Sequence, residues 1–389
     1  MQEFGSIRYL MNNIKVCHVI SGYYRNDPRI FQRQCKSLKE AGFLVSILTN
    51  DDFPDENLEG TPIYATGNYW SNRIRVLLLA KNQFFKRALE IDADIYQMHS
   101  PELLSLGLAL KKVGKMVVYD AHEDLPRHII EKDWLPRIVR KPLSLIVEKY
   151  MNHILRRYHA IISPHSHVVD TLKEINPNTI LITNFAKVLP SNDISLNEYL
   201  QRHKIICYSG TVYLHSNQVS IFDALNEFTD VTYSIAGYFA PEYLELLSKH
   251  PSFNKLSYIG RINWADLSEF YKKARIGIVV IDYKMNLGGK RGTYAVNKIF
   301  EYMEAALPII CSDYELWKEI VDEFKCGFYV EPGNVVQIRE AIAYLINNPE
   351  KAYQMGQNGR KAILEEYNWA NEEKKYVKLF NSFSLLNKI

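Results

Sequence analysis

The chain has 389 residues, of which 47% are hydrophobic and 23% are charged. These values are those of a globular protein and exclude a disordered, collagen-like or coiled-coil chain. The formal net charge of +3 is too small for a dedicated nucleic-acid binder, and the excess lies in the first half of the chain. The length suits two domains of about 150 to 200 residues each.

Short β-branched runs alternate with helical patterns through the first half of the chain. The predicted helices between the runs end at glycine, as residues 29–41 do at Gly42 and residues 102–113 at Gly114. Alternation of this kind predicts parallel strands joined by crossover helices. The predicted strands of this series are residues 15–21, 44–49, 94–98, 116–120, 160–163 and 180–183.

A second series of strands follows a polar stretch at residues 190–203, which has no strand pattern and predicts a linker. We therefore expect an α/β protein with two doubly wound Rossmann-like domains, residues 11–189 and 204–368, each binding its ligand at the carboxyl ends of its strands. We expect residues 369–389 to form a helix that packs back on the first domain, and assign residues 1–10 no structural role. The second series comprises residues 205–209, 232–236, 256–258, 276–281, 308–311 and 327–330.

The five cysteines show no disulfide or metal-binding spacing. None stands in a CxxC pair, and Cys17, Cys207 and Cys311 lie in apolar, strand-like runs. We expect buried thiols in the reducing cytoplasm. The chain has neither a signal-peptide pattern nor a run of about 18 apolar residues, so we expect no membrane-spanning segment.

The strongest local signal is a glycine-rich loop, residues 286–293, followed by a helix that begins near Asn297. The free N–H groups and the positive dipole end of such a helix attract phosphate, and glycines allow close approach. The pattern predicts a site for a nucleoside diphosphate, although an ordinary amphipathic surface helix remains the alternative. The side chains expected to bond phosphate or ribose are Lys290, Arg291, Lys298 and Glu301.

The segment around Glu301 resembles the nucleotide-sugar motif of family-4 glycosyltransferases of the GT-B fold, in the variant K-I/L-F-E-Y-M. The resemblance implies a retaining, metal-independent glycosyltransferase whose two Rossmann-like domains face each other across a cleft. It implies a nucleotide diphosphate sugar of UDP or GDP type as donor, a glycan or lipid-linked acceptor, and a role in surface polysaccharide or glycoconjugate synthesis. The other stretches that carry it are residues 19–22, 27–31, 94–103, 118–123, 209–210 and 259–261.

The resemblance also implies which residues hold the donor. In the family Glu301 is the second glutamate of an E-x7-E pair, and Thr293 stands where the first would be. The arginine and lysine that many relatives carry after the first glycine of the second domain are missing after Gly210, so we expect His215 and the loop cations to replace their charge. The implied donor contacts are Gly22, Gly210, His215, Arg261, Lys290, Arg291, Thr293, Asn297, Lys298 and Glu301.

In the first domain the resemblance makes His122 the residue that contacts the transferring sugar. A neutral imidazole can bond a sugar hydroxyl, and beside Asp120 it can carry positive charge that steadies a developing anion. Asp27, Arg29 and His99 are further acceptor candidates. An N-cap role for Asp27 and a structural role for His99 are the alternatives.

The mechanism implied is a front-face one, in which the leaving diphosphate oxygen helps to deprotonate the acceptor. The predicted catalytic residues are His122, Lys298 and Glu301, and no metal is required. Residues 92–94 match a D-x-D metal motif. We reject this metal site because Asp94 opens a strand and therefore lies at the amino edge of the sheet.

Two other functions remain open on the sequence alone. A nucleotide-sugar epimerase of the same architecture would need acid and base carboxylates in its site. A catalytically idle, nucleotide-binding partner subunit would explain Thr293 and the missing basic pair. Residues 137–157 are basic and amphipathic, so contact with the anionic inner face of the cell membrane is a further expectation, with a solvated helix face as the alternative.

Overall fold

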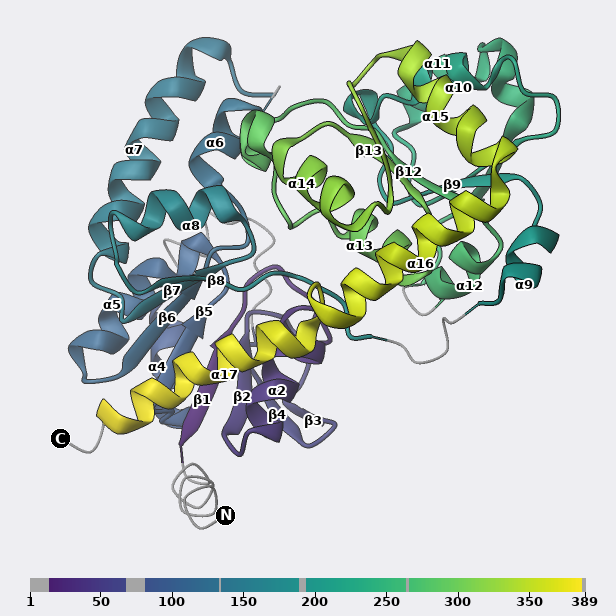
Figure 1. Ribbon diagram of the computed structural model, residues 1–389. Helices are drawn as coiled ribbons and strands as arrows, with labels where there is room; N and C mark the ends of the chain where they lie inside the picture. Colours follow the sequence, from purple (N-terminus) through teal and green to yellow (C-terminus); the bar gives the residue numbers. More distant parts are fainter. Residues whose placement is uncertain (1–13, 68–80, 133, 189–193, 264–265, 387–389) are drawn as a thin grey trace. The chain divides into compact units, whose positions relative to one another are not determined.

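The computed structural model describes residues 14–67, 81–132, 134–188, 194–263 and 266–386 (Figure 1). They form two compact units, of which the first comprises the chain up to Asn184 and again from Trp369, and the second comprises Phe185–Asn368. Residues 1–10 and the start of the predicted linker lie outside the described residues. The rest of that linker carries helix α9 (Leu196–Gln201), which a capping box between Ser195 and Glu198 begins.

An eight-stranded sheet forms the centre of the first unit, in the order β3-β4-β2-β1-β5-β6-β7-β8. The neighbouring strands pair in parallel except β3 with β4. The strands are β1 (Lys15–Val19), β2 (Leu44–Thr49), β3 (Glu56–Leu58), β4 (Thr61–Ala65), β5 (Ile95–Met98), β6 (Met116–Asp120), β7 (Ala160–Ser163) and β8 (Thr179–Leu181). The sequence did not predict β3 and β4, because β3 buries no side chain and β4 contains Pro62.

The helices of the first unit connect these strands. The predicted helix at residues 29–41 is in fact a π-helix, η1 (Ile30–Cys35), that continues as α2 (Lys36–Glu40). The others are α4 (Lys81–Ile91), η3 (Pro101–Leu103), α5 (Leu104–Lys112), α6 (Leu125–Ile130), α7 (Arg137–Leu155) and α8 (Ser166–Lys173).

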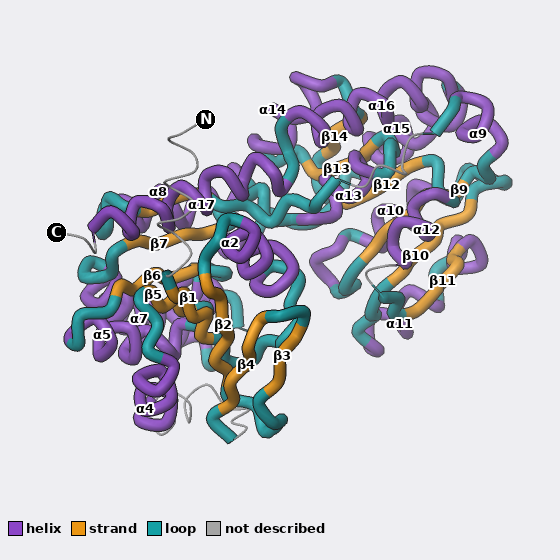
Figure 2. The backbone as a smooth tube through the Cα atoms, turned by 90° about the horizontal axis from the view of Figure 1, so that it is seen from below, coloured by secondary structure: helices purple, strands orange, loops and turns teal. Residues whose placement is uncertain are grey.

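The last helix, α17 (Trp369–Leu386), belongs to the first unit and runs beside α2 (Figure 2). Trp369 donates its indole N–H to Ser37 Oγ at 2.9 Å, and Tyr376 donates its hydroxyl to Gln97 Oε1 at 2.6 Å. Both aromatic rings are buried in one core cluster with residues of β1 and β2. Leu379, Phe380 and Phe383 join them in the same cluster, and burial of these apolar side chains stabilises the packing of α17 on the first unit.

A six-stranded parallel sheet forms the centre of the second unit, in the order β11-β10-β9-β12-β13-β14. This order is that of the Rossmann fold, 3-2-1-4-5-6, so the predicted doubly wound fold is confirmed. The strands are β9 (Ile205–Ser209), β10 (Thr232–Ala236), β11 (Leu256–Gly260), β12 (Ile276–Val279), β13 (Ile309–Ser312) and β14 (Gly327–Val330). The α-helices after α9 are α10 (Gln218–Leu225), α11 (Pro241–Ser248), α12 (Leu267–Lys272), α13 (Asn297–Glu304), α14 (Glu315–Phe324), α15 (Val335–Asn347) and α16 (Pro349–Glu365).

The five cysteines are free and buried, as predicted. Burial raises the pKa of the Cys17 and Cys326 thiols to about 12, so both are protonated and unreactive at neutral pH. Within the described ranges, no helix has the length and apolar character needed to cross a bilayer.

Candidate functional site

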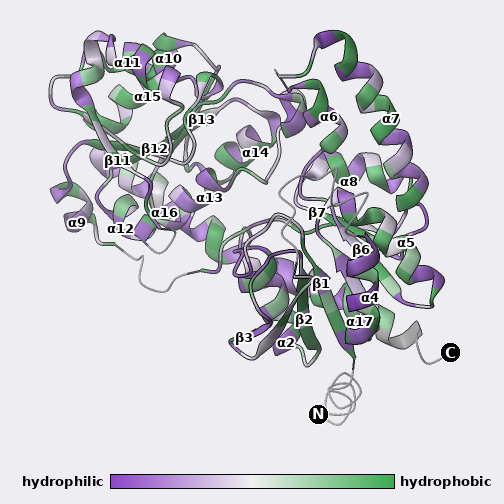
Figure 3. Cartoon of the chain, turned by 180° about the vertical axis from the view of Figure 1, so that it is seen from behind, coloured by the Kyte–Doolittle hydropathy of each residue, from purple (hydrophilic) through white to green (hydrophobic). Residues whose placement is uncertain are grey.

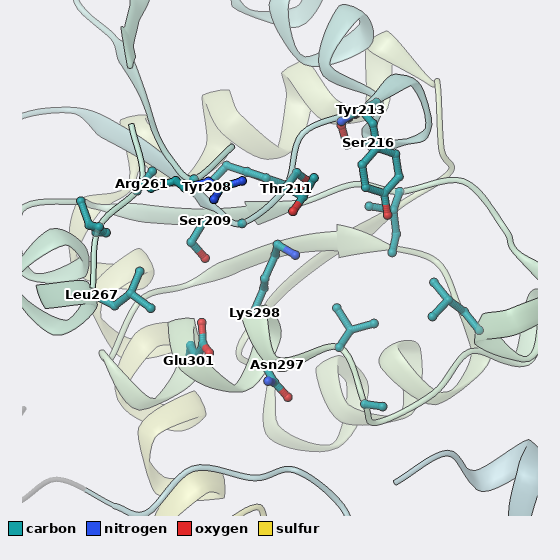
Figure 4. Close-up of a pocket in the computed structure, with 18 residues that line it drawn as sticks. Tyr208, Ser209, Thr211, Tyr213, Ser216, Arg261, Leu267, Asn297, Lys298 and Glu301 are labelled. Carbon is teal, nitrogen blue, oxygen red and sulfur yellow. Dashed lines mark hydrogen bonds between the residues drawn. The ribbon is translucent and has the colours of Figure 1, made fainter. Parts of the chain in front are cut away.

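A pocket of about 640 Å³ opens in the second unit, where β9, β10 and β11 end and α13 begins (Figure 4). Its volume is that of a site for a small molecule or a nucleotide. Five of the residues predicted to hold a donor line it, namely Gly210, Arg261, Asn297, Lys298 and Glu301.

Two glycines shape the floor of the pocket. Gly237 has φ +146°, and a Cβ atom there would lie 1.9 Å from the carbonyl oxygen of Gly210. Gly210 has φ +112°, and a Cβ atom there would lie 2.8 Å from Cε of Lys298. Neither position accepts a side chain without displacing its neighbour. The turns after β9 and β10 therefore lie close together, and Lys298 packs directly against the first of them.

Lys298 brings positive charge to the first turn of α13. Its Nζ lies 5.3 Å from the centre of the Tyr208 ring, and its side chain points into the pocket (Figure 4). Burial lowers the pKa of Lys298, whereas the nearby Glu301 carboxylate raises it. The dipole of α13 adds to the positive potential at this end of the helix. Lys298 and the start of α13 together favour a bound anion.

A buried chain of hydroxyl groups orients Glu301. Tyr271, on α12, donates its hydroxyl to Glu301 Oε2 at 2.7 Å, and Ser209 Oγ lies 2.8 Å from the same tyrosine oxygen. Tyr302 extends the chain, because its hydroxyl accepts the backbone N–H of Ser209 at 3.1 Å. The bond from Tyr271 engages one carboxylate oxygen, so Glu301 keeps acceptor capacity for ligand hydroxyls.

Sequence reasoning missed Tyr271. Its partners stand 62 residues before it and 30 residues after it, at Ser209 and Glu301. No local motif marks a tyrosine on a six-residue helix. Only the packing of α12 beside β9 and α13 gives it a role.

The other predicted donor residues of the second unit are not part of the pocket wall. Thr293 is fully buried, and its Oγ1 accepts the backbone N–H of Ala295 at 3.1 Å. His215 Nδ1 lies 3.4 Å from an oxygen of Asp282. Lys290 and Arg291 are exposed on the loop before α13. Donor contacts by these four residues stay predictions.

In the first unit, Asp120 is the centre of a buried polar network at the end of β6. Arg29 binds its carboxylate in a bidentate manner, with Nε at 3.0 Å and Nη2 at 2.8 Å, and Gln34 donates to Oδ2 at 2.7 Å. The π-helix explains this convergence, because its backbone bond from Gln34 N to Arg29 O spans five residues and stacks the two side chains. Burial would raise the pKa of Asp120, but the positive charge of Arg29 and bonds from two histidines hold it well below 3.8.

Three histidines extend the network toward the surface. His18 Nδ1 lies 2.9 Å from His99 Nε2, and His99 Nδ1 lies 3.2 Å from His122 Nε2. Burial lowers the pKa of His99 to about 4, so His99 is neutral at pH 7. His122 Nε2 also lies 3.1 Å from Asp120 Oδ2, and its side chain is 14% exposed. His122 therefore forms the accessible end of the network, beside Tyr23 and Glu123.

The remaining predicted residues of the first unit occupy supporting positions. Asp27 Oδ1 accepts the backbone N–H groups of Arg29 and Ile30, which is the N-cap arrangement that the sequence left open. Arg29 is 4% exposed and also donates Nη1 to the carbonyl of Ile182 and to Asn184. Acceptor contacts by these residues and by His99 stay predictions.

Another pocket, in the wall of which Gly22 lies, opens in the first unit. It has a volume of about 770 Å³, and other residues in its wall are Tyr24, Arg25, Asp51 and Phe53. It lies where β1 and β2 end. Gly22 faces open space in its own unit, since a Cβ atom there would meet no other atom within 4 Å, and its donor contact stays a prediction.

Among the residues that the structure describes, one group of side chains has ligand atoms close enough for a metal ion. These atoms of His99, Asp120 and His122 lie within 4.8 Å of one another. Both oxygens of Asp120 already accept hydrogen bonds from Arg29, whose positive charge also opposes a cation. The group therefore fits a metal poorly.

Family models match both halves of the chain. Residues 29–184 match the model described as Glycosyltransferase Family 4, and residues 197–362 match the one described as Glycosyl transferases group 1. No curated protein matches the chain by sequence.

Several solved structures have the same fold. Sucrose-phosphate synthase from Thermosynechococcus elongatus is 14% identical, with a TM-score of 0.71 over 95% of this chain and 99% of that one. HepE of Anabaena, solved with UDP and glucose, is also 14% identical, with a TM-score of 0.71 over 95% of this chain and 100% of that one. A mutant of TarM from S. aureus, in complex with fondaparinux, alpha-GlcNAc-glycerol and UDP, is 11% identical. Its TM-score is 0.71 over 95% of this chain and 100% of that one. At such identities the likeness is one of fold.

Proposed function

Because the chain belongs to the group 1 glycosyltransferases and has the GT-B fold, we propose that it transfers a sugar with retention of anomeric configuration and without a metal ion. The proposed donor is a nucleoside diphosphate sugar of UDP or GDP type. The proposed acceptor is a glycan or a lipid-linked sugar of a surface polysaccharide or glycoconjugate.

The observation that supports this donor is the pairing of Lys298 with Glu301 at the start of α13, inside one pocket. A carboxylate held by Tyr271 is suited to accept hydrogen bonds from the two hydroxyls of a ribose. One helical turn earlier, Lys298 and the helix N-terminus are suited to the diphosphate. The HepE and TarM structures contain UDP, which favours a uridine nucleotide.

In the proposed reaction the acceptor hydroxyl attacks the anomeric carbon as the bond from that carbon to the diphosphate oxygen breaks. The proton of the hydroxyl passes to the leaving diphosphate, so charge and atoms balance without an external base. His122 contacts the transferring sugar, and the buried Asp120 stabilises positive charge on its imidazole. Lys298 stabilises the negative charge that develops on the leaving group.

An epimerase of the same architecture is the second candidate function. Glu301 is the only carboxylate in the described wall of this pocket, so the acid and the base of an epimerase would have to include carboxylates from elsewhere in the chain. The idle-subunit alternative differs in its products: such a subunit would bind a nucleotide and never release nucleoside diphosphate from a sugar nucleotide.

Calorimetry with UDP and with GDP tests the donor site in wild type and Glu301→Ala. Two lost hydrogen bonds to a carboxylate, at about 1.5 kcal/mol each, predict about 100-fold weaker binding of the preferred nucleotide. Glu340→Ala removes an exposed carboxylate of α15 and is the matched control, for which we expect wild-type affinity. Equal affinity of Glu301→Ala and wild type would refute the assignment. NMR of products from a panel of sugar nucleotides then reports transfer and anomeric configuration.

A further inference from the structure

Helix α7 exposes large apolar side chains along one face. The buried side chains, among them Ser144, Met151 and Leu155, lie on the opposite face and hold the helix to its own unit. At 100° per residue, positions 138, 142, 145, 146 and 149 share the solvent face. Figure 3 shows hydrophobic positions interleaved with hydrophilic ones along the whole of α7. The exposed fractions are 84% for Ile138, 48% for Leu145 and 65% for Ile146.

Two further exposed apolar residues precede α7 in the chain. Trp134, just before the helix, is 74% exposed, and Ile130, at the end of α6, is 42% exposed. Single exposed apolar residues are normal on a protein. A group of them on one helix and in the segment just before it indicates an interaction site. We call these five residues, Ile130, Trp134, Ile138, Leu145 and Ile146, the α6–α7 surface.

Positive charge surrounds this surface. Residues 130–157 contain seven Lys and Arg against three Asp and Glu, a net charge of +4, whereas the whole chain has +3. The remainder of the chain is therefore slightly acidic. Arg137, Lys141 and Lys149 are exposed on α7 itself, and Glu148 is the one acid within the helix. Long cationic side chains can extend sideways from an apolar strip to reach negative charge.

The apolar side chains and the positive charge of the α6–α7 surface together favour one kind of partner. A second copy of the chain would place +4 against +4, which opposes association. A nucleic acid would leave isoleucine, leucine and tryptophan side chains without apolar contacts. A helix with an apolar strip bordered by Lys and Arg, and a tryptophan at its edge, is suited to the headgroup region of an anionic bilayer.

We propose that the α6–α7 surface binds the face of an anionic membrane, with Ile138 and Ile146 inserted among the lipid headgroups. Membrane binding also favours a lipid-linked acceptor over a free glycan, because an enzyme bound to the bilayer meets lipid-linked sugars there. This choice of acceptor rests on the proposed function. Membrane binding itself does not depend on the catalytic assignment, so the two can fail separately.

The test is flotation of the full-length protein with vesicles of phosphatidylcholine, with and without phosphatidylglycerol. We expect binding to the anionic vesicles alone, and weaker binding as salt rises. Ile138→Glu/Ile146→Glu should lower partition at least about tenfold, because burial of one isoleucine already exceeds a tenfold change. Val336→Glu/Leu364→Glu changes two residues of the second unit that are each 50% exposed, and should bind like wild type.

Calorimetry with UDP on both double variants shows that the donor site remains folded, and wild-type affinity is expected in each. Three outcomes would overturn the proposal. The wild type does not bind anionic vesicles, the control variant loses as much binding as the test variant, or sedimentation velocity shows a dimer that Ile138→Glu/Ile146→Glu dissociates.

Discussion

Removing the Tyr271 hydroxyl separates positioning of Glu301 from direct ligand contact. The hydroxyl donates to Glu301 Oε2 at 2.7 Å and lies 2.8 Å from Ser209 Oγ. A hydrogen bond to a charged group is worth about 1.5–3 kcal/mol. Glu301 is only partly buried, so water replaces part of the lost bond in Tyr271→Phe. We therefore expect a loss of about 1 kcal/mol, which is about fivefold weaker binding of the nucleoside diphosphate.

Calorimetry with the nucleotide on a double-mutant cycle measures this coupling. In the Glu301→Ala background, Tyr271→Phe should cause no further loss, because the two residues act through one bond. Tyr283→Phe is the matched control, since it also removes a tyrosine-to-carboxylate bond, to Asp313, but outside the pocket wall. A fivefold loss in both backgrounds, or an affinity for Tyr271→Phe equal to wild type, would contradict the reasoning.

Three further predictions concern catalysis, pH and metal. His122→Ala should lower kcat about 100-fold and leave the affinity for the nucleotide unchanged, as steady-state kinetics and calorimetry will show; a parallel loss of affinity would count against this. Burial lowers the pKa of His99 and His165 to about 4, below about 6.5 in the unfolded chain, so the unfolded state gains more protons below pH 6.5. The free energy of unfolding should therefore be largest above pH 6.5 and fall toward pH 4, by up to about 1.4 kcal/mol per pH unit for each histidine. Denaturant titrations that give the same free energy of unfolding at every pH between about 7.5 and 5 would contradict this prediction. Turnover should survive EDTA, and a complete loss that manganese restores would disprove the metal-free reaction.

The sequence predicts what neighbouring residues determine. Asn297, Lys298 and Glu301 all lie near the start of one helix, so one local motif identifies them together, and the structure places them in one pocket. Parallel strands were predictable because their buried runs are short and β-branched, whereas the polar β3 and the proline-containing β4 lack that pattern.

Contacts between residues that are far apart in the sequence could not be predicted from local patterns. Arg29 and Asp120 are separated by 91 positions, and their ion pair depends on the π-helical turn of η1, which no residue pattern announces. The sequence offered Arg29 as a candidate for acceptor contact through the family resemblance of residues 27–31. In the fold, Nε and Nη2 of Arg29 hold the acid that contacts His122, and Nη1 binds the carbonyl of Ile182.

The missing basic pair after Gly210 raises the question of how the diphosphate is neutralised, and the position of Lys298 offers an answer. A Cβ atom on Gly210 would lie 2.9 Å from Lys298 Nζ, so the ammonium group occupies the turn at which the absent side chains would begin. Burial lowers the pKa of that ammonium group, and a bound diphosphate would raise it again. The charged state of Lys298 and the bound diphosphate then stabilise each other. Because a side chain on Gly210 would displace Lys298, the glycine and the lysine form one phosphate site in this proposal.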